Sequence, residues 1–203
     1  PLGGGVRSDA VIWAVILAAG ESRRMGTQKL LLPFGEATVV EAVVRTALAS
    51  MVDRAVAVVG ADGEAVRARL GPSGADIAVN ARFAEGMLTS IQAGLRALPP
   101  DAEAAVVMLG DQPFLPPAVV DLVIRGYRVS GRGIVIPVFR GRRGHPVLVD
   151  LKYRDEVLSY DPADGLRRLL RAHPDDIAEV ETDDPNILRD LDTPEDYAGA
   201  KEH

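Results

Sequence analysis

The sequence predicts one α/β domain, a Rossmann-like three-layer sandwich in which helices cover both faces of a mainly parallel sheet. Short apolar runs alternate with amphipathic stretches along the chain, as they do in proteins of this class. The chain has 203 residues, 47% of them hydrophobic, which suits one sizeable core. No repeat, linker or low-complexity tract interrupts the pattern. We therefore expect a single domain over residues 10–203, preceded by a flexible leader at residues 1–9.

The strands are predicted from short, continuously apolar runs, which are typical of strands buried on both faces of a sheet. These runs are residues 11–17, 55–59, 104–109 and 134–138, with a weaker candidate at residues 77–79. Residues 60–63 and 71–74 contain paired glycines and are predicted to be turns.

The helices are predicted from apolar residues spaced three and four apart. Thr38 and Glu41 form a capping box before the first helical pattern, at residues 39–48. A second pattern begins at Met87 and is stopped by two consecutive prolines at residues 99–100. Pro117 opens a third helix that extends to about residue 127.

Composition excludes several classes of function. The net charge of −6 argues against a general nucleic-acid surface, and no apolar run approaches the ~18 residues of a membrane span. Cysteine is absent, which excludes disulfides, thiolate metal sites and a cysteine nucleophile. The N-terminus shows no signal-peptide pattern. We expect a cytoplasmic protein without nucleic-acid or membrane partners.

The loop at residues 17–29 carries the strongest chemical signal. It follows a predicted buried strand and places Gly20, Gly26, Arg23, Arg24 and Lys29 close together. The glycines allow backbone N–H groups to approach phosphate oxygens, and the basic side chains supply charge and donors. The spacing matches neither the Walker A loop nor G-x-G-x-x-G. The loop therefore predicts a polyphosphate site of another kind.

Further polar segments follow other predicted strands, and ligands of open α/β sheets bind where strands end. Residues 80–90 follow the third predicted strand, and Gly110 and Asp111 follow the fourth. Mg²⁺ prefers a few carboxylates together with phosphate oxygens and water, so Asp111 is predicted to be a magnesium ligand. Acidic residues crowd residues 175–196, and charge density alone cannot choose a second ligand among them.

Five sequence blocks together resemble the molybdenum cofactor cytidylyltransferases, the MocA-type nucleotidyltransferases. Residues 17–33 fill every position of the signature L-A-A-G-x-S-x-R-M-G-x-x-K-x-L-L-P. The other blocks are E-G-M-x-x-S at residues 85–90, G-D-Q-P at 110–113, R-G-H-P at 143–146 and D-x-D-T-P-E-D at 190–196. The resemblance implies the nucleotide-diphospho-sugar transferase fold, which is GT-A-like.

The resemblance and the loop chemistry together give an expected site. Arg23, Lys29 and Asp111 are expected to be catalytic, and Asp111 and Asp192 to hold the metal, with Asp190 as the next candidate. The expected nucleotide-binding residues are Leu17, Ala18, Ala19, Gly20, Arg23, Lys29, Asn80, Glu85, Gly86, Met87 and Ser90. The expected acceptor-binding residues are Gly144, His145, Pro146 and Arg167.

The implied reaction transfers CMP from CTP to the terminal phosphate of a molybdopterin-type cofactor, with Mg²⁺ and release of pyrophosphate. Guanylyl-transferring relatives tend to carry Gly where this chain has Ala19, so the resemblance favours cytosine. Two alternatives stay open: a sibling enzyme that uses GTP or a sugar 1-phosphate, and a nucleotide or cofactor carrier without turnover. A client molybdoenzyme or its maturation factor is a further candidate partner.

Overall fold

The computed structural model describes residues 9–20, 28–60, 63–191 and 193–200. Its main sheet has the strand order β10-β7-β9-β6-β1-β4-β5, and β8 pairs with β7. These strands are β1 (Ile12–Ala18), β4 (Arg54–Val59), β5 (Asp76–Val79), β6 (Ala104–Leu109), β7 (Ile134–Phe139), β8 (Arg142–Arg143), β9 (Val147–Asp150) and β10 (Ile177–Glu181). A separate hairpin pairs β2 (Pro33–Phe34) with β3 (Ala37–Thr38).

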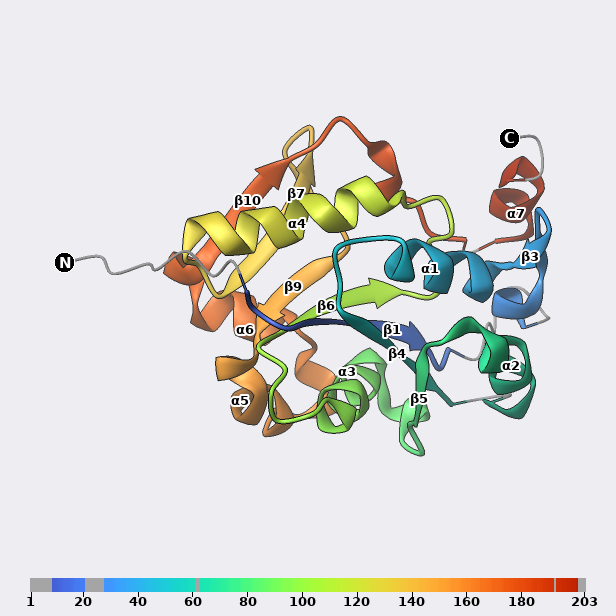
Figure 1. The fold of residues 1–203 in the computed structure, drawn as a ribbon, viewed down its shortest axis with the longest axis horizontal. Coiled ribbons are helices and arrows are strands. Elements are labelled where there is room, and N and C mark those ends of the chain that lie inside the picture. Colours follow the sequence, from blue (N-terminus) through green and yellow to red (C-terminus); the bar gives the residue numbers. More distant parts are fainter. Residues whose placement is uncertain (1–8, 21–27, 61–62, 192, 201–203) are drawn as a thin grey trace.

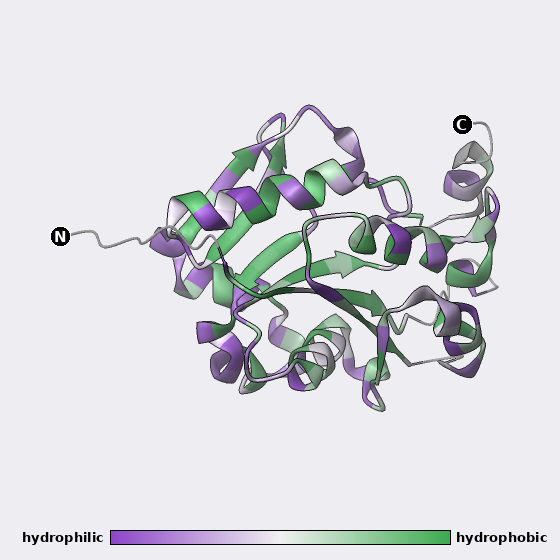
Figure 2. Ribbon diagram, in the orientation of Figure 1, coloured by the Kyte–Doolittle hydropathy of each residue, from purple (hydrophilic) through white to green (hydrophobic). Residues whose placement is uncertain are grey.

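Helices cover both faces of the sheet and make three layers (Figure 1). One face carries α1 (Val39–Leu48), α2 (Gly63–Leu70) and α4 (Pro117–Ser130). The other carries α3 (Met87–Ala97), α5 (Arg154–Leu158) and α6 (Arg167–Ala172). The helix α7 (Pro194–Ala200) lies near the β2–β3 hairpin. In Figure 2 the strands are largely apolar, and the helices turn polar residues outward.

The alternation of side chains along β1 divides the core into two apolar clusters. Ile12, Ala14 and Ile16 pack into the cluster under α1 and α4, whereas Trp13 and Val15 pack into the cluster under α3. The strand β1 lies between β4 and β6 and is buried on both faces. Its residues are continuously apolar because side chains on both of its faces enter the core.

The predicted three-layer α/β fold is confirmed, and the five predicted strands and three predicted helices are all present. The Thr38–Glu41 capping box is also present at the start of α1. The prediction of mere turns at residues 60–63 and 71–74 is incomplete, because α2 begins at Gly63 between them. That helix buries only Val66 and Leu70, so its apolar pattern is weak.

One central strand runs against the others. The strand β9 is antiparallel to both β6 and β7, and the short β8 is antiparallel to β7, whereas the other neighbouring pairs of the main sheet are parallel. Consequently the start of β9, not its end, lies beside the carboxyl end of β6.

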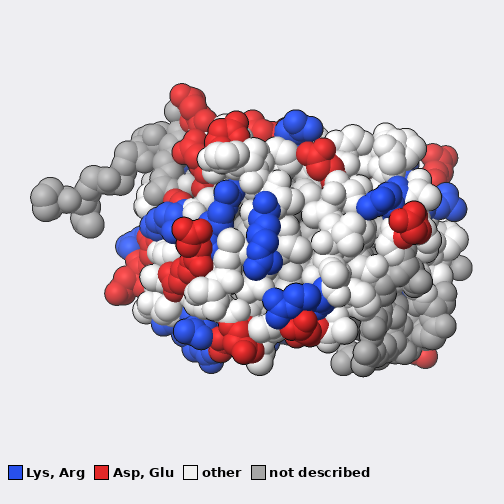
Figure 3. All heavy atoms as spheres, turned by 90° about the horizontal axis from the view of Figure 1, so that it is seen from below, with Lys and Arg blue, Asp and Glu red and all other residues white. Residues whose placement is uncertain are grey.

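Among the described helices, none combines the length and apolar character needed to span a membrane. On the face shown in Figure 3, basic and acidic side chains are interspersed, and no continuous basic surface forms there.

Candidate active site

A pocket of about 470 Å³ lies where β1, β5 and β6 end. Residues from segments far apart in the sequence line it: Leu17, Ala19, Gly20, Lys29, Leu30, Phe83, Ala84, Gly86, Met87, Ser90, Leu109, Asp111 and Asp190. The sheet topology brings these segments together because the three strands are parallel and end at one edge. The pocket is therefore at the edge that the sequence predicts for a ligand.

An ion pair lies in this pocket. Lys29 Nζ is 2.6 Å from Asp111 Oδ2, and the two side chains are only 13% and 20% exposed. Lys29 begins a short 3-10 helix at Lys29–Leu31, while Asp111 follows β6. The Asp111 carboxylate therefore pairs with a cation at a partly buried position, where electrostatic attraction is stronger than in bulk water.

The polyphosphate loop is described only at its two ends. Arg23, Arg24 and Gly26 lie outside the described residues. At the near end, Leu17, Ala19 and Gly20 line the pocket, whereas Ala18 is buried and does not. Gln28 Nε2 donates to the carbonyl oxygen of Gly20 at 3.2 Å, which ties the two ends of the loop together.

Two residues that line the pocket, Ala19 and Phe83, pack closely around Gly60. A Cβ atom added at Gly60 would lie 2.8 Å from Phe83 Cβ and 2.9 Å from Ala19 Cβ. Only a residue without a side chain allows both neighbours to approach so closely. Sequence reasoning missed Phe83, although its position three residues after Asn80 within the predicted ligand segment was an available signal.

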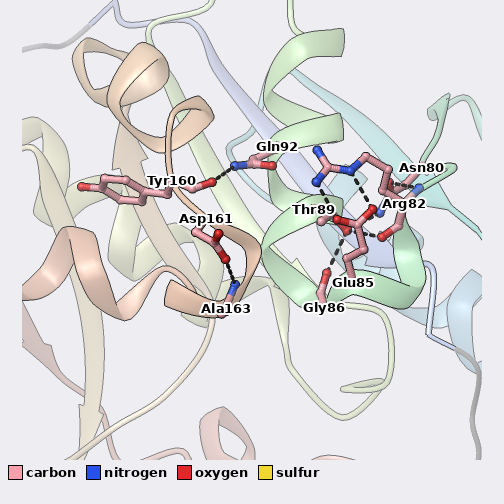
Figure 4. A network of polar contacts seen from close by, with 9 residues as sticks. All are labelled: Asn80, Arg82, Glu85, Gly86, Thr89, Gln92, Tyr160, Asp161 and Ala163. Atoms are coloured by element: carbon pink, nitrogen blue, oxygen red, sulfur yellow. Dashed lines mark hydrogen bonds and ion pairs between the residues drawn. The ribbon is translucent and has the colours of Figure 1, made fainter.

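The segment that follows β5 is held by its own polar network (Figure 4). Asn80 is buried, and its Nδ2 donates to Thr89 Oγ1 and Ser90 Oγ, both at 2.9 Å. Arg82 and Glu85 form an exposed ion pair, which lowers the pKa of Glu85. Asn80 and Glu85 do not line the pocket, so their predicted contact with nucleotide stays a prediction.

Three other residues of that segment do line the pocket: Gly86, Met87 and Ser90. Gly86 precedes α3 with a φ of 119°, a value that favours glycine. Met87, the first residue of α3, is 57% exposed despite its size. The start of α3 therefore presents a flexible apolar side chain to a ligand.

The C-terminal acidic segment reaches the pocket through Asp190. Gln112 Nε2 donates to Asp190 Oδ1 at 2.6 Å, and Leu191 N donates to the carbonyl oxygen of Asp111 at 3.0 Å. Asp192, the expected second metal ligand, lies outside the described residues. Among the described residues, Asp190 is the acidic side chain that joins Asp111 in lining the pocket.

The predicted acceptor residues are not among those that line the pocket. Gly144 packs so closely on Ile187 that an added Cβ would lie 2.3 Å from the Ile187 carbonyl oxygen. Burial lowers the pKa of His145, and the nearby Asp111 carboxylate opposes this shift. His145 and Pro146 precede β9, which brings them to the end of β6. Arg167 is exposed at the start of α6.

The donor set of the pocket suits a hard divalent cation. Asp111 and Asp190 offer carboxylate oxygens, the ligand type that Mg²⁺ and Mn²⁺ prefer. Within the described ranges, no cluster of three or more His, Cys, Asp or Glu residues could hold a metal alone. A cation here would therefore take its remaining ligands from phosphate oxygens and water.

Comparisons with known proteins agree with this chemistry. Residues 14–177 match the family model described as the MobA-like NTP transferase domain. The chain is 30% identical over 194 residues to the molybdenum cofactor cytidylyltransferase of Escherichia coli (strain K12), covering 95% of this chain and 97% of that protein. It is 33% identical over 198 residues to the nicotine blue oxidoreductase of Paenarthrobacter nicotinovorans, covering 91% and 93%.

A solved structure extends the comparison to three dimensions. The complex of Rv0371C with manganese, from Mycobacterium tuberculosis H37Rv, matches with a TM-score of 0.79 and 28% identity. The match covers 95% of this chain and 99% of that one. A protein with this architecture therefore holds a divalent cation.

Proposed function

The chain belongs to the MobA-like NTP transferase family, and on this premise we propose that it transfers CMP from CTP to the terminal phosphate of a molybdopterin-type cofactor. Pyrophosphate is released and Mg²⁺ is required. The observation that carries the proposal is the Lys29–Asp111 pair inside the strand-end pocket. It supplies charges of both signs where a triphosphate and its cation would have to meet.

The proposed step needs no protein nucleophile. An oxygen of the acceptor phosphate attacks the α-phosphorus of CTP, a new P–O bond forms, and the bond to the bridging oxygen of pyrophosphate breaks. The electron pair leaves with pyrophosphate. Catalysis is then mostly positioning and stabilisation of charge. This explains why a chain without cysteine can perform the reaction.

Named residues would divide these tasks. Lys29 and Arg23 would hold the triphosphate, and the backbone at Gly20 would approach it closely. Asp111 and an acid of the C-terminal segment, Asp190 or Asp192, would hold Mg²⁺. When bound, Mg²⁺ would neutralise charge on the α-phosphate and the leaving pyrophosphate. His145, next to Asp111, would meet the acceptor phosphate from the opposite side.

The proposed preference for CTP rests on the side of the pocket that Ala19 and Phe83 line. Ala19 and Phe83 fill the space around Gly60, so this wall of the pocket is already crowded. A pyrimidine needs less space than a purine, and the Ala19 methyl group reduces the space further. A size filter of this kind reaches roughly 10–200-fold. Weak use of GTP is therefore compatible with the proposal.

A nucleotide panel tests the reaction. Pyrophosphate release is measured with each NTP and purified molybdenum cofactor, and we expect release with CTP that depends on Mg²⁺. Asp111→Asn keeps the shape but removes a charge, and should abolish release and the response to metal. Asp76→Asn, at an exposed position on the edge strand β5, is the matched control and should match the parent.

Other results of the same panel would replace the proposal. Faster release with GTP would favour a guanylyltransferase, and release only with a sugar 1-phosphate would favour a sugar nucleotidyltransferase. Tight CTP binding without release with any acceptor would favour a carrier. A relative named nicotine blue oxidoreductase shares a third of the residues, so the acceptor must be tested directly.

A further inference from the structure

We propose that Gln112 is a positioning residue whose side-chain amide holds the Asp190 carboxylate in the pocket, so that Asp190 and Asp111 together receive the divalent cation. The inference rests on the proposed function in one respect only, the use of a divalent cation at this pocket. It assigns a task to a buried polar side chain that the proposed reaction leaves unused.

The geometry joins Gln112 directly to a pocket carboxylate. Gln112 follows Asp111 in the chain and is 2% exposed. Its Nε2 donates to Asp190 Oδ1 at 2.6 Å, and Asp190 lines the pocket. A hydrogen bond to a carboxylate is shorter and stronger than one between neutral groups. The contact therefore restrains the orientation of the Asp190 side chain.

The amide can adopt only one orientation in this contact. Among the described residues, nothing donates a hydrogen bond to the buried Gln112 Oε1. Rotating the amide by half a turn would place that oxygen against the Asp190 carboxylate and would lose the bond. A buried acceptor left unsatisfied is unfavourable. In this orientation Oε1 lacks a hydrogen bond, whereas Nε2 keeps the bond that orients Asp190.

A second buried glutamine shows what a purely structural amide does in this chain. Gln92 is also 2% exposed, but its Nε2 donates to the carbonyl oxygen of Val157 at 3.0 Å and to that of Tyr160 at 3.1 Å. Figure 4 shows the contact with Tyr160. The two contacts tie α3 to α5 and to the segment after it, and do not restrain a side chain of the pocket. Gln92 is therefore a matched control of the same residue type and burial.

The backbone around Asp190 is already fastened without Gln112. Leu191 N donates to the Asp111 carbonyl oxygen at 3.0 Å, and the Arg189 guanidinium lies 3.6 Å from the Phe114 ring centroid. These contacts fix where the segment runs. The Gln112 contact acts on the Asp190 carboxylate itself, so its loss should disturb ligand geometry more than the fold. Partners of this kind orient metal ligands in other proteins.

Binding of Mn²⁺ tests the inference without relying on turnover. Mn²⁺ is titrated into the protein, alone and with CTP, and free Mn²⁺ is followed by electron paramagnetic resonance. The variants are Gln112→Met, which has nearly the same volume but no donor, Asp190→Asn, the double variant and Gln92→Met. We expect Gln112→Met to weaken Mn²⁺ binding about tenfold, the usual effect of losing a partner that orients a ligand, and Asp190→Asn, which loses a ligand, to weaken it at least as much.

The double variant separates positioning from an independent effect. If Gln112 acts through Asp190, the double variant binds Mn²⁺ no more weakly than Asp190→Asn alone. Gln92→Met should lower the thermal midpoint but leave Mn²⁺ affinity within twofold of the parent. Additive losses in the double variant, parent-like Mn²⁺ binding by Gln112→Met, or a parent that binds no Mn²⁺ would each overturn the inference.

Failure of the proposed function would look different. A parent protein that binds Mn²⁺ in a manner dependent on Gln112, but releases no pyrophosphate from CTP, supports the inference and contradicts the proposed reaction. Conversely, the parent could release pyrophosphate from CTP while Gln112→Met leaves its Mn²⁺ affinity unchanged. That result would support the proposed reaction and overturn the inference.

Discussion

Lys29 places an ammonium group in a partly buried pocket, 2.6 Å from the Asp111 carboxylate. Charge at such a site has a much larger effect than in bulk water. We expect Lys29→Ala to lower the turnover of CTP at least about 100-fold, or roughly 2.7 kcal/mol of transition-state stabilisation. Steady-state release of pyrophosphate measures this loss.

Lys152→Ala is the control for that experiment. Lys152 pairs with Asp176 at 2.7 Å, and its side chain is 45% exposed away from the pocket. Its turnover should equal that of the parent. Turnover by Lys29→Ala within threefold of the parent would show that Lys29 does not hold the triphosphate.

Ala19 is the residue on which nucleotide choice is predicted to depend. The parent should bind CTP at least about tenfold more tightly than GTP, a difference of roughly 1.4 kcal/mol. Ala19→Gly removes the methyl group beside Phe83 and should narrow that preference. Competition calorimetry with both nucleotides measures the ratio. Tighter binding of GTP than of CTP by the parent would reverse the assignment.

Sequence reasoning located much of the pocket at the level of single residues, and the reason is the motif spacing. Lys29, Gly86 and Asp111 each follow a strong local signal and line one pocket. Phe83 lies within the predicted ligand segment, but its place in the pocket depends on the absence of a side chain at Gly60, a residue distant in sequence. Charge density did not distinguish Asp190 from its acidic neighbours, and the resemblance ranked it after Asp192; the structure places it in the pocket lining, in contact with Gln112.

The N-terminus of α1 is capped by hydrogen bonds between Thr38 and Glu41. Thr38 donates to Glu41 Oε2 through its backbone N at 2.7 Å and through Oγ1 at 2.6 Å, and these bonds lower the pKa of Glu41. Thr38→Val removes the hydroxyl donor and should lower the free energy of unfolding by about 1 kcal/mol at pH 7. Urea unfolding measures this difference.

The difference should shrink in acid. Because the folded pKa of Glu41 is lowered, its stabilisation is present above the usual value of 4.5 and is lost as the pH falls through the folded pKa. Parent and Thr38→Val should therefore converge as the pH falls through that range. A difference that stays constant from pH 7 into this range would show that the Glu41 carboxylate is not involved.

The helix α3 lies so close to the sheet that Gly94 is required. An added Cβ would lie 2.3 Å from Val15 Cγ1 and 3.1 Å from Val58 Cγ2. Alanine normally stabilises a helix interior by about 0.5–1 kcal/mol relative to glycine, whereas overpacking costs about 1–3 kcal/mol. We expect the clash to prevail, so Gly94→Ala should lower the free energy of unfolding by about 1 kcal/mol or more.

Gly71→Ala is the control, because a Cβ at Gly71 would meet nothing within 4 Å. Its stability should equal or slightly exceed that of the parent. Denaturant titration of both variants gives the comparison. A Gly94→Ala protein as stable as the parent would mean that α3 can move away from β1 without cost.

At the level of elements, strongly patterned segments were predictable and segments defined by their neighbours were not. Residues 104–109 are continuously apolar and form β6 with those bounds. By contrast, β10 has the sequence IAEVE and lies at the edge of the sheet, so its short alternating pattern resembles a loop rich in acids. The five-residue helix α5 likewise has too few turns to show a period.

At the scale of the whole molecule, the proposed acceptor residues before β9 lead into a strand that runs against the strands whose ends carry the pocket residues. Chain leaving β1, β5 and β6 forms the proposed nucleotide side, and chain about to enter β9 forms the proposed acceptor side. The proposed nucleotide side and the proposed acceptor side thus adjoin strands of opposite direction.

Because the two sides come from different segments of the chain, we expect that the proposed acceptor side can be changed without changing the proposed nucleotide side. Replacing residues 140–146 by the corresponding segment of a relative should change which acceptor is used while leaving CTP affinity within about threefold, a difference below 1 kcal/mol. Calorimetry with CTP and pyrophosphate release with alternative acceptors would measure the two sides separately. A lineage could then acquire a new acceptor by altering one entry loop, with the donor half inherited unchanged.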